Sequence, residues 1–269
     1  MRRFAPSVPL SVLALSAVAL LSLAPPSAAE VQTKEVTYKQ GDAELQGFFA
    51  WDDQAKGKRP GVVVVHEWWG HNQHARNQAI RLARAGYVGF ALDMFGKGKV
   101  TTHPPDAQAF VAEATKDPQV AKARFLAALD LLQKDPHVDP ARVAAIGYCF
   151  GGGVVLAMAR QGVDLDAVVS FHGSIATKTP AAPGAVKARL LVLNGEDDGM
   201  VTAEQIAALK KEMADAGAKL DFVNLPHARH SFTNPDADKV GMPALAYSAE
   251  ADKESWERAM KLFGEVFAQ

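Results

Sequence analysis

Cysteine is nearly absent from this chain, which holds one, Cys149, among 269 residues. A single cysteine excludes any disulfide within the chain. A free thiol is a liability in an oxidising compartment, so one that is kept there is either buried or used. An excess of charge of one sign is also absent, because 29 basic and 30 acidic residues give a formal net charge of −1. The chain has no general basic field for nucleic acid, and we expect no nucleic-acid partner.

Long apolar runs are confined to the N-terminal segment. Two arginines precede an apolar, uncharged run at residues 8–24, and Ser27-Ala28-Ala29 offers the small residues that signal peptidase reads. This pattern predicts a signal peptide over residues 1–29, cleaved before Glu30, and hence a periplasmic or secreted protein. An uncleaved membrane anchor is the alternative, but the run is short for a spanning helix. The segment also lacks the cysteine of a lipoprotein anchor, so we expect no stable membrane anchor.

Residues 30–269 contain no internal repeat, low-complexity block or linker, which predicts one domain. Strand patterns are found at residues 31–38, 43–50, 62–65, 88–92, 142–146, 167–171, 189–194 and 219–225. Helical patterns are found at residues 72–85, 104–114, 120–134, 152–160, 203–216 and 248–267. The alternation of the two predicts an α/β fold with a mostly parallel central sheet and helices on both faces.

The hexapeptide Gly147-Tyr148-Cys149-Phe150-Gly151-Gly152 joins a predicted strand to a predicted helix. A Gly-x-nucleophile-x-Gly pattern at such a junction is typical of a nucleophile elbow. The glycines leave room for the flanking strand and helix around a strained turn. At the start of a helix, the positive end of the helix dipole would favour the Cys149 thiolate. The alternative is a glycine-rich turn that contains a small buried cysteine.

Other predicted strands are also followed by polar groups, and in a parallel sheet such groups collect beyond the carboxyl ends of the strands. Asp197 and Asp198 follow one later strand, and His230 follows the next. The chain order of nucleophile, acid and histidine is that of α/β-hydrolases. Cys149 would be the nucleophile, His230 its base, and Asp198 the carboxylate that orients the imidazole. Spacing from Gly195 favours Asp198 over Asp197, which would then cap the following turn.

The chain resembles the dienelactone hydrolase family on these motifs. The motifs are the hexapeptide around Cys149, Gly195-x-x-Asp198-x-x-Val201, His230-Ser231-Phe232, and His66-Glu67 after the early strand. The resemblance implies an α/β-hydrolase fold with Cys149, Asp198 and His230 as the triad. It also implies that Glu67 interacts with the resting thiol and helps to activate it when substrate arrives. A carboxylate there can accept the thiol proton, although its charge opposes the thiolate. The alternative for Glu67 is an exposed loop carboxylate.

The oxyanion of the reaction would need backbone amides as donors. The residue after the nucleophile normally gives one, here Phe150, and Trp68 in the loop after the early strand is our choice for the second. Aromatic and other large side chains near these loops could wall a pocket. They are Trp68, Trp69, Met94, Phe95, Phe171, His172 and Phe232. Together they predict a mainly apolar or aromatic substrate.

Two departures from the family concern arginine. Relatives that cleave dienelactone hold its carboxylate with arginines, one of them four residues beyond the catalytic histidine. This chain has Asn234 at that position and no arginine from Lys97 to Lys116. Asn234 is therefore predicted to bind substrate, and Lys97 or Lys99 could act as a point charge without the bidentate geometry of arginine. Dienelactone itself is not the expected substrate.

The sequence thus predicts an exported, cysteine-dependent hydrolase of carboxylic esters or lactones that needs no cofactor. The expected partner is a small-molecule ester or lactone, with a monomer as the default state. A metallohydrolase is an alternative because His66, Glu67, His71 and His74 cluster, but their spacing is not His-Glu-x-x-His, and no metal is expected. A second alternative is a non-catalytic exported binding protein on a hydrolase fold. A peptidase or thioesterase would use the same acyl chemistry.

Overall fold

The computed structural model describes Met1 and residues 30–268. The predicted signal peptide, apart from Met1, lies outside these residues. The strands are β1 (Val31–Gln40), β2 (Ala43–Asp52), β3 (Arg59–Val65), β4 (Val88–Leu92), β5 (Val138–Tyr148), β6 (Ala167–Phe171), β7 (Arg189–Gly195) and β8 (Leu220–Leu225). The helices are α1 (Gln73–Arg84), α2 (Pro104–Thr115), α3 (Pro118–Gln133), α4 (Phe150–Arg160), α5 (Ala203–Asp215), α6 (Ala249–Phe267) and the 3₁₀ helix η1 (Ala237–Val240).

The strands form one sheet in the order β1-β2-β4-β3-β5-β6-β7-β8. The β1–β2 hairpin is antiparallel, and β2 also pairs antiparallel with β4. Every later pair is parallel. The prediction of a mostly parallel α/β sheet is confirmed. Because the parallel strands run in one direction, the loops after β3, β5, β7 and β8 meet at one edge of the sheet.

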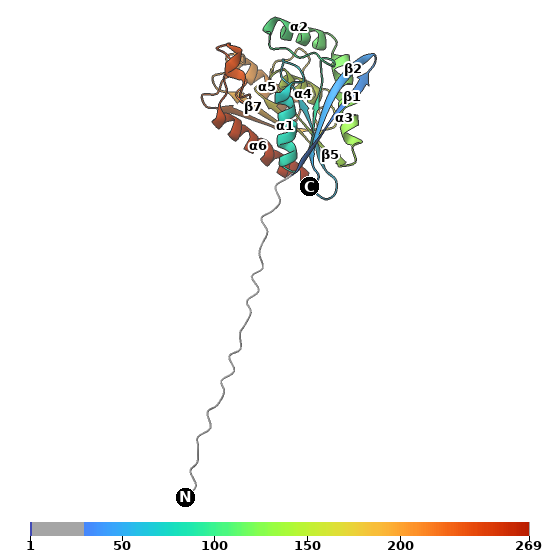
Figure 1. The fold of residues 1–269 in the computed structure, drawn as a ribbon. Helices are drawn as coiled ribbons and strands as arrows, with labels where there is room; N and C mark the ends of the chain where they lie inside the picture. Colours follow the sequence, from blue (N-terminus) through green and yellow to red (C-terminus); the bar gives the residue numbers. More distant parts are fainter. Residues whose placement is uncertain (2–29, 269) are drawn as a thin grey trace.

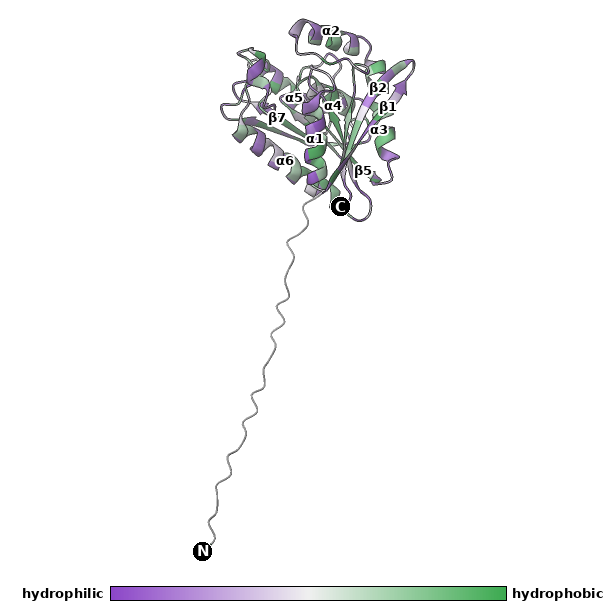
Figure 2. Ribbon diagram, in the orientation of Figure 1, coloured by the Kyte–Doolittle hydropathy of each residue, from purple (hydrophilic) through white to green (hydrophobic). Residues whose placement is uncertain are grey.

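Helices cover both faces of the sheet (Figure 1). Apolar side chains of α1 and α6 pack on one face. Those of α3, α4 and α5 pack on the other face. The central strand β3 is buried along its whole length, as its run of four valines predicts. Figure 2 shows the same layering, with hydrophobic strands inside and hydrophilic positions on the outer sides of the helices.

Some element boundaries differ from the prediction. Strand β5 begins at Val138 rather than at residue 142, because Val138 and Asp139 pair with Arg59 and Pro60 before the register shifts. The polar side chains around this irregular stretch concealed it in the sequence. Helix η1 was not predicted, since one short turn carries no helical periodicity.

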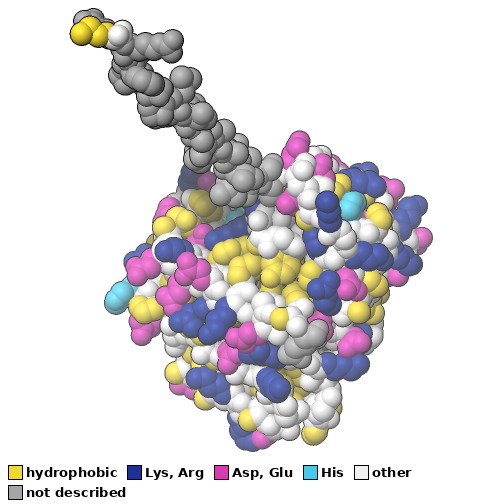
Figure 3. Space-filling view, turned by 90° about the horizontal axis from the view of Figure 1, so that it is seen from below, with side chains coloured by type: hydrophobic (Ala, Val, Ile, Leu, Met, Phe, Trp, Pro, Cys, Tyr) yellow, Lys and Arg dark blue, Asp and Glu magenta, His cyan; other side chains and the backbone are white. Residues whose placement is uncertain are grey.

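The surface carries both signs of charge. Figure 3 views the molecule from below and shows apolar side chains near the middle of that face, with basic and acidic groups interspersed around them. This agrees with the nearly neutral balance of the sequence. Among the described residues, no helix has the length and apolar character needed to cross a bilayer.

Candidate active site

Cys149 lies at the sharp turn between β5 and α4. Its φ of 53° and ψ of −115° are unusual for a residue with a side chain, as a nucleophile elbow requires. The neighbouring glycines are required by close contacts. A Cβ on Gly147 would lie 2.1 Å from the Gly151 carbonyl oxygen, and one on Gly151 would lie 2.3 Å from the Val65 carbonyl oxygen. The turn therefore presents a half-buried thiol at the N-terminus of α4.

His230 and Asp198 form a buried pair after β8 and β7. Nδ1 of His230 lies 2.8 Å from Oδ2 of Asp198. Oδ1 of Asp198 accepts a hydrogen bond of 2.9 Å from the Met200 amide, which fixes the carboxylate in place. The adjacent Asp197 is exposed. Of the two rival aspartates, Asp198 therefore orients the imidazole.

The other ring nitrogen of His230, Nε2, is not used by Asp198. Nε2 is buried and has no hydrogen-bond partner among the described residues, while His230 and Cys149 line the same cavity. Burial alone would lower the pKa of His230. The charge of the nearby Cys149 thiolate and the Asp198 carboxylate overcome this and hold that pKa well above its ordinary value. The imidazole of His230 is therefore suited to carry a positive charge between Cys149 and Asp198.

Glu67 is buried after β3, not an exposed loop carboxylate. Its Oε1 accepts a hydrogen bond of 2.9 Å from the Ser231 hydroxyl, and its Oε2 one of 2.6 Å from Nδ2 of Asn234. Both donors belong to residues 226–236, the segment after β8 that carries His230 and that we call the histidine loop. Asn234 was predicted to bind substrate, but its amide group is used to hold Glu67. It does not line the cavity that contains Cys149.

His172 was also predicted to bind substrate, but its ring is fully buried after β6 and does not line that cavity. Its Nδ1 accepts a 3.1 Å hydrogen bond from the Cys149 amide, and its Nε2 lies 2.8 Å from Oγ1 of Thr233. An accepting Nδ1 makes His172 a neutral imidazole that donates from Nε2. Burial first, and then the nearby His230 and His74, hold its pKa well below the ordinary value. No motif distinguished this role, or that of Thr233, in the sequence.

The cavity at Cys149 has a volume of about 870 Å³ and is lined mainly by apolar side chains. Cys149, His230, Trp68 and Phe150 all line it. Phe150 is the first residue of α4, so its amide has no carbonyl partner within the helix and is free to donate. The structure thus brings the residues predicted to donate to the oxyanion and Cys149 to one cavity.

Besides His172, four aromatic side chains predicted to wall the pocket lie elsewhere, and so does Met94. Trp69 packs in a small cluster with Ala107 and Leu245. Met94, Phe95, Phe171 and Phe232 are almost fully buried, and none of them lines the cavity. These positions follow from packing, because a buried aromatic ring beside a site stabilises its loops without reaching the opening.

The histidines and the glutamate of the metal alternative do not converge. His66 uses both ring nitrogens, with Nδ1 at 2.6 Å from the Glu67 carbonyl oxygen and Nε2 accepting from the Met94 amide at 3.1 Å. Burial lowers the pKa of His71 to about 4. Both carboxylate oxygens of Glu67 accept hydrogen bonds from the histidine loop. Within residues 30–268, no group of three or more His, Cys, Asp or Glu side chains is arranged to hold a metal ion.

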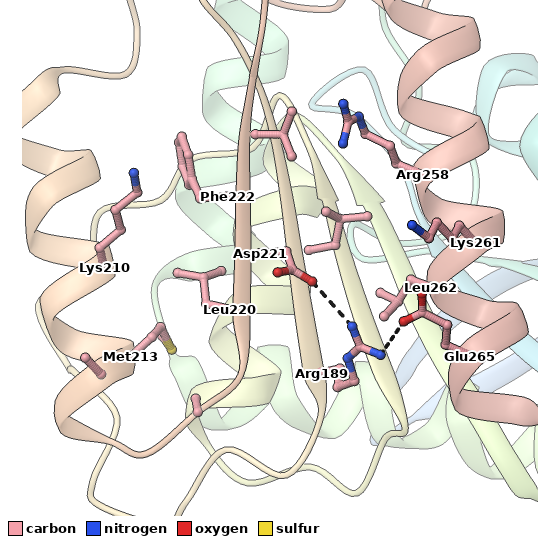
Figure 4. Close-up of a pocket in the computed structure, with 14 residues that line it drawn as sticks. Arg189, Lys210, Met213, Leu220, Asp221, Phe222, Arg258, Lys261, Leu262 and Glu265 are labelled. Atoms are coloured by element: carbon pink, nitrogen blue, oxygen red, sulfur yellow. Dashed lines mark hydrogen bonds and ion pairs between the residues drawn. The ribbon is translucent and has the colours of Figure 1, made fainter. Parts of the chain in front are cut away.

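A second cavity, of about 620 Å³, lies between α5, α6 and the edge strand β8. Figure 4 shows Arg189 bridging Asp221 and Glu265 there, at distances of 3.4 and 2.6 Å. Arg189 and Leu220 are the first residues of β7 and β8, so these two lie at the sheet edge opposite Cys149. Among the described residues that line this cavity there is no cysteine, serine, threonine or histidine.

Comparison with known families and proteins identifies relatives over most of the chain. A model described as the dienelactone hydrolase family matches residues 45–267. A putative carboxymethylenebutenolidase of Yersinia pestis is 28% identical over 235 residues, which cover 83% of this chain and 84% of the relative. Protein usf of Aquifex pyrophilus is 27% identical over 219 residues, which cover 80% of this chain and 93% of the relative.

Solved structures agree with this grouping. A dienelactone hydrolase-like promiscuous phosphotriesterase from metagenomic libraries is 37% identical, with a TM-score of 0.84, over 88% of this chain and 98% of that one. An α/β hydrolase enzyme from a deep-sea metagenome library has a TM-score of 0.66 at 16% identity, covering 90% of this chain and 100% of that one. The second likeness concerns the fold alone, and it agrees with the α/β-hydrolase fold predicted from the order of the motifs.

Proposed function

The chain belongs to the dienelactone hydrolase family and is a hydrolase of esters or lactones, and we propose that Cys149, His230 and Asp198 are its catalytic triad. The observation that carries this proposal is the position of His230. One ring nitrogen is bonded to Asp198, and the other is free in the cavity that exposes Cys149. A nucleophile, a base and an orienting carboxylate in series are the arrangement that activates a thiol for acyl transfer.

The first half of the reaction forms an acyl-enzyme. The Cys149 thiolate attacks the carbonyl carbon, and a C–S bond forms while the carbonyl electrons move to oxygen. The amides of Phe150 and Trp68 stabilise that oxyanion. When the intermediate collapses, the C–O bond to the leaving group breaks and His230 donates its proton to the departing alkoxide.

The second half releases the acid. His230, now neutral, removes a proton from water, and the resulting hydroxide attacks the acyl-thioester. The C–S bond breaks, the carboxylic acid leaves, and the thiolate–imidazolium pair is restored. Glu67 is suited to influence this cycle through the histidine loop, because both of its partners, Ser231 and Asn234, follow His230 closely in the sequence.

The test is hydrolysis of a panel of aryl esters and lactones by residues 30–269 and by the Cys149→Ala variant. Turnover that disappears in the variant would support Cys149 as the nucleophile. Equal turnover in both would refute the mechanism. With a 4-nitrophenyl ester as substrate, the wild type or Cys149→Ser should release one 4-nitrophenol per enzyme in a burst before a slower steady state. Such a burst would reveal the acyl-enzyme directly.

Phosphotriester hydrolysis is a second candidate activity. The relative that is 37% identical is named a promiscuous phosphotriesterase. A triester is uncharged, which suits a cavity whose lining is mostly apolar. Diethyl 4-nitrophenyl phosphate therefore belongs in the same panel, with Cys149→Ala as the control for thiol-dependent turnover.

Export remains part of the proposal. It rests on the basic start, apolar run and small residues of the N-terminal segment. Expression of the full chain in a bacterial host, followed by fractionation and N-terminal sequencing, tests it. A mature protein that starts at Glu30 outside the cytoplasm supports export, and an intact chain in the cytoplasm contradicts it.

A further inference from the structure

The cavity that begins at Cys149 continues along one face of α4. Its lining from this helix includes Phe150, Gly153, Ala157 and Arg160, which are three or four residues apart and so form one stripe. At a rise of 1.5 Å per residue, this stripe is about 15 Å long. Gly153 and Ala157 give it a floor without bulky side chains. We call this extended part of the cavity the α4 groove.

The other walls of the α4 groove come from two separate parts of the chain. The end of α2 and the start of α3 supply Val111, Thr115 and Ala121. The loop after β6 supplies Ser174 and residues 176–180. The α4 groove therefore lies between helices on one side and a loop on the other, and Cys149 is at one end of it.

Free charge is scarce along the α4 groove. Among the described residues that line the cavity there is no aspartate or glutamate, and besides His230 the basic side chains are Arg160 and Lys178. The side chain of Arg160 is 5% exposed and is paired with Glu212 at 2.8 Å. Lys178 is exposed to solvent. A carboxylate placed beside Arg160 would lose its hydration, and that cation is already neutralised by Glu212.

We propose that the substrate is an uncharged ester with an elongated apolar chain that lies in the α4 groove. This inference rests on the proposed function, because it needs Cys149 to attack the ester carbonyl at the groove end. Each methylene removed from water favours binding, and the gain is worth roughly fourfold in kcat/KM per methylene when it is realised in the transition state. The chain is either the acyl or the alkyl half of the ester.

The experiment measures kcat/KM for two series with the chain from residue 30 to 269. One series varies the acyl chain from acetate to octanoate on 4-nitrophenol, and the other varies the alkyl alcohol from methyl to octyl on acetate. We expect kcat/KM to rise with chain length in one series, which identifies the half that occupies the groove. A flat or falling profile in both series, with acetate still hydrolysed, overturns the inference and leaves the proposed function intact. If no ester or lactone is hydrolysed, the proposed function fails, and this inference fails with it.

Charge and groove shape are tested separately. The 4-nitrophenyl ester of octanedioic acid carries a carboxylate at the chain end, and it should react at least tenfold more slowly than the octanoate; equal rates overturn the requirement for an uncharged chain. Ala157→Phe fills the groove floor and should lower the ratio of octanoate to acetate turnover at least tenfold. The matched control is Ala208→Phe, at an exposed position of α5 outside both cavities. Equal ratios in the two variants overturn the placement of the chain.

Discussion

The imidazole Nδ1 of His172 accepts a hydrogen bond from the backbone amide of Cys149 at 3.1 Å. The same ring lies 2.8 Å from Oγ1 of Thr233 through Nε2, so it links the nucleophile turn to the histidine loop. The Cys149 amide also donates to the Phe171 carbonyl oxygen at 3.0 Å. His172 thus contributes to the position of Cys149 relative to His230 without touching substrate.

Replacement of His172 should disturb this positioning. In His172→Phe the Cys149 amide keeps only the Phe171 carbonyl, and Thr233 loses its partner. We expect kcat/KM to fall about tenfold, which corresponds to one lost hydrogen bond of about 1.4 kcal/mol. The pH at which the thiolate forms, followed by absorbance near 240 nm, should also shift. Thr233→Val is the matched control, because it removes only the far end of the link. A His172→Phe enzyme with an unchanged thiolate titration would show that the ring acts by packing alone.

Asp198 and Asp197 offer a matched pair of neighbours. Asp198→Asn removes the charge that orients His230, and we expect kcat to fall by about 10²–10⁴. Asp197→Asn changes an exposed carboxylate with no part in the triad, so its kcat should stay within twofold of the parent. Steady-state kinetics of both variants on one aryl ester decide the matter. Comparable losses of kcat in the two variants would show that Asp198 is not the carboxylate that orients His230.

The proton on His230 should depend on Cys149. In the intact pair the thiolate and Asp198 raise the pKa of His230 well above its ordinary value of 6.5, against the effect of burial. Cys149→Ala removes one of the two negative partners, so the pKa of His230 should fall. Histidine titration by NMR in both proteins measures this shift, and an equal or higher pKa in Cys149→Ala contradicts it.

The same pKa has a consequence for stability. A folded-state pKa above 6.5 means that the folded protein holds this proton more tightly than the unfolded chain. The resulting stabilisation is complete below pH 6.5 and is lost as the pH rises through the folded-state pKa. Cys149→Ala should therefore show a smaller decline in the free energy of unfolding over that interval, measured by urea denaturation at a series of pH values.

Much of the fold followed from sequence patterns, but the placement of several site residues did not. Runs such as Val62–Val65 predicted buried strands, and the order of Cys149, Asp198 and His230 predicted which loops would meet. The substrate contacts were less predictable, because a residue type does not reveal where its side chain points. His172 and Asn234 are polar groups near a site, and the structure uses both to support neighbouring backbone or carboxylate atoms. The small residues Gly153 and Ala157, four apart on α4, were the available signal for the groove.

Glu67 should contribute to stability through the histidine loop. Glu67→Gln removes the buried charge and leaves one acceptor oxygen where Ser231 and Asn234 now donate to two. We expect a loss of about 1–3 kcal/mol, or roughly 2–10 °C in Tm. The double variant Glu67→Gln/Asn234→Asp restores a donor–acceptor pair and should recover most of that Tm. If activity stays low in the recovered double variant, the Glu67 carboxylate acts on the reaction as well as on the fold. Full recovery of both would assign Glu67 to structure alone.

Arg160 and Glu212 form hydrogen bonds to the loop after β6, which forms one wall of the α4 groove. The Arg160 guanidinium donates to both Glu212 oxygens, at 2.8 and 3.0 Å, and to the Ile175 carbonyl oxygen at 2.9 Å. Glu212 in turn accepts from the Ala181 amide at 2.9 Å. The Glu212 side chain is 10% exposed, so Arg160→Met would leave a largely buried carboxylate without its cation.

That variant should therefore lose about 3–5 kcal/mol of unfolding free energy. Arg160→Met/Glu212→Leu removes both charges and should lose less than the single variant, because no ion is left unpaired. Urea denaturation measures the free energy of unfolding of both variants. An equal or larger loss in the double variant would show that the loop depends on the hydrogen bonds to Ile175 and Ala181 more than on the ion pair. Since the loop forms one wall of the groove, KM for the octanoate ester should rise more than KM for the acetate in the double variant. If the two KM values change equally, the loop contributes to stability but not to binding of the longer ester.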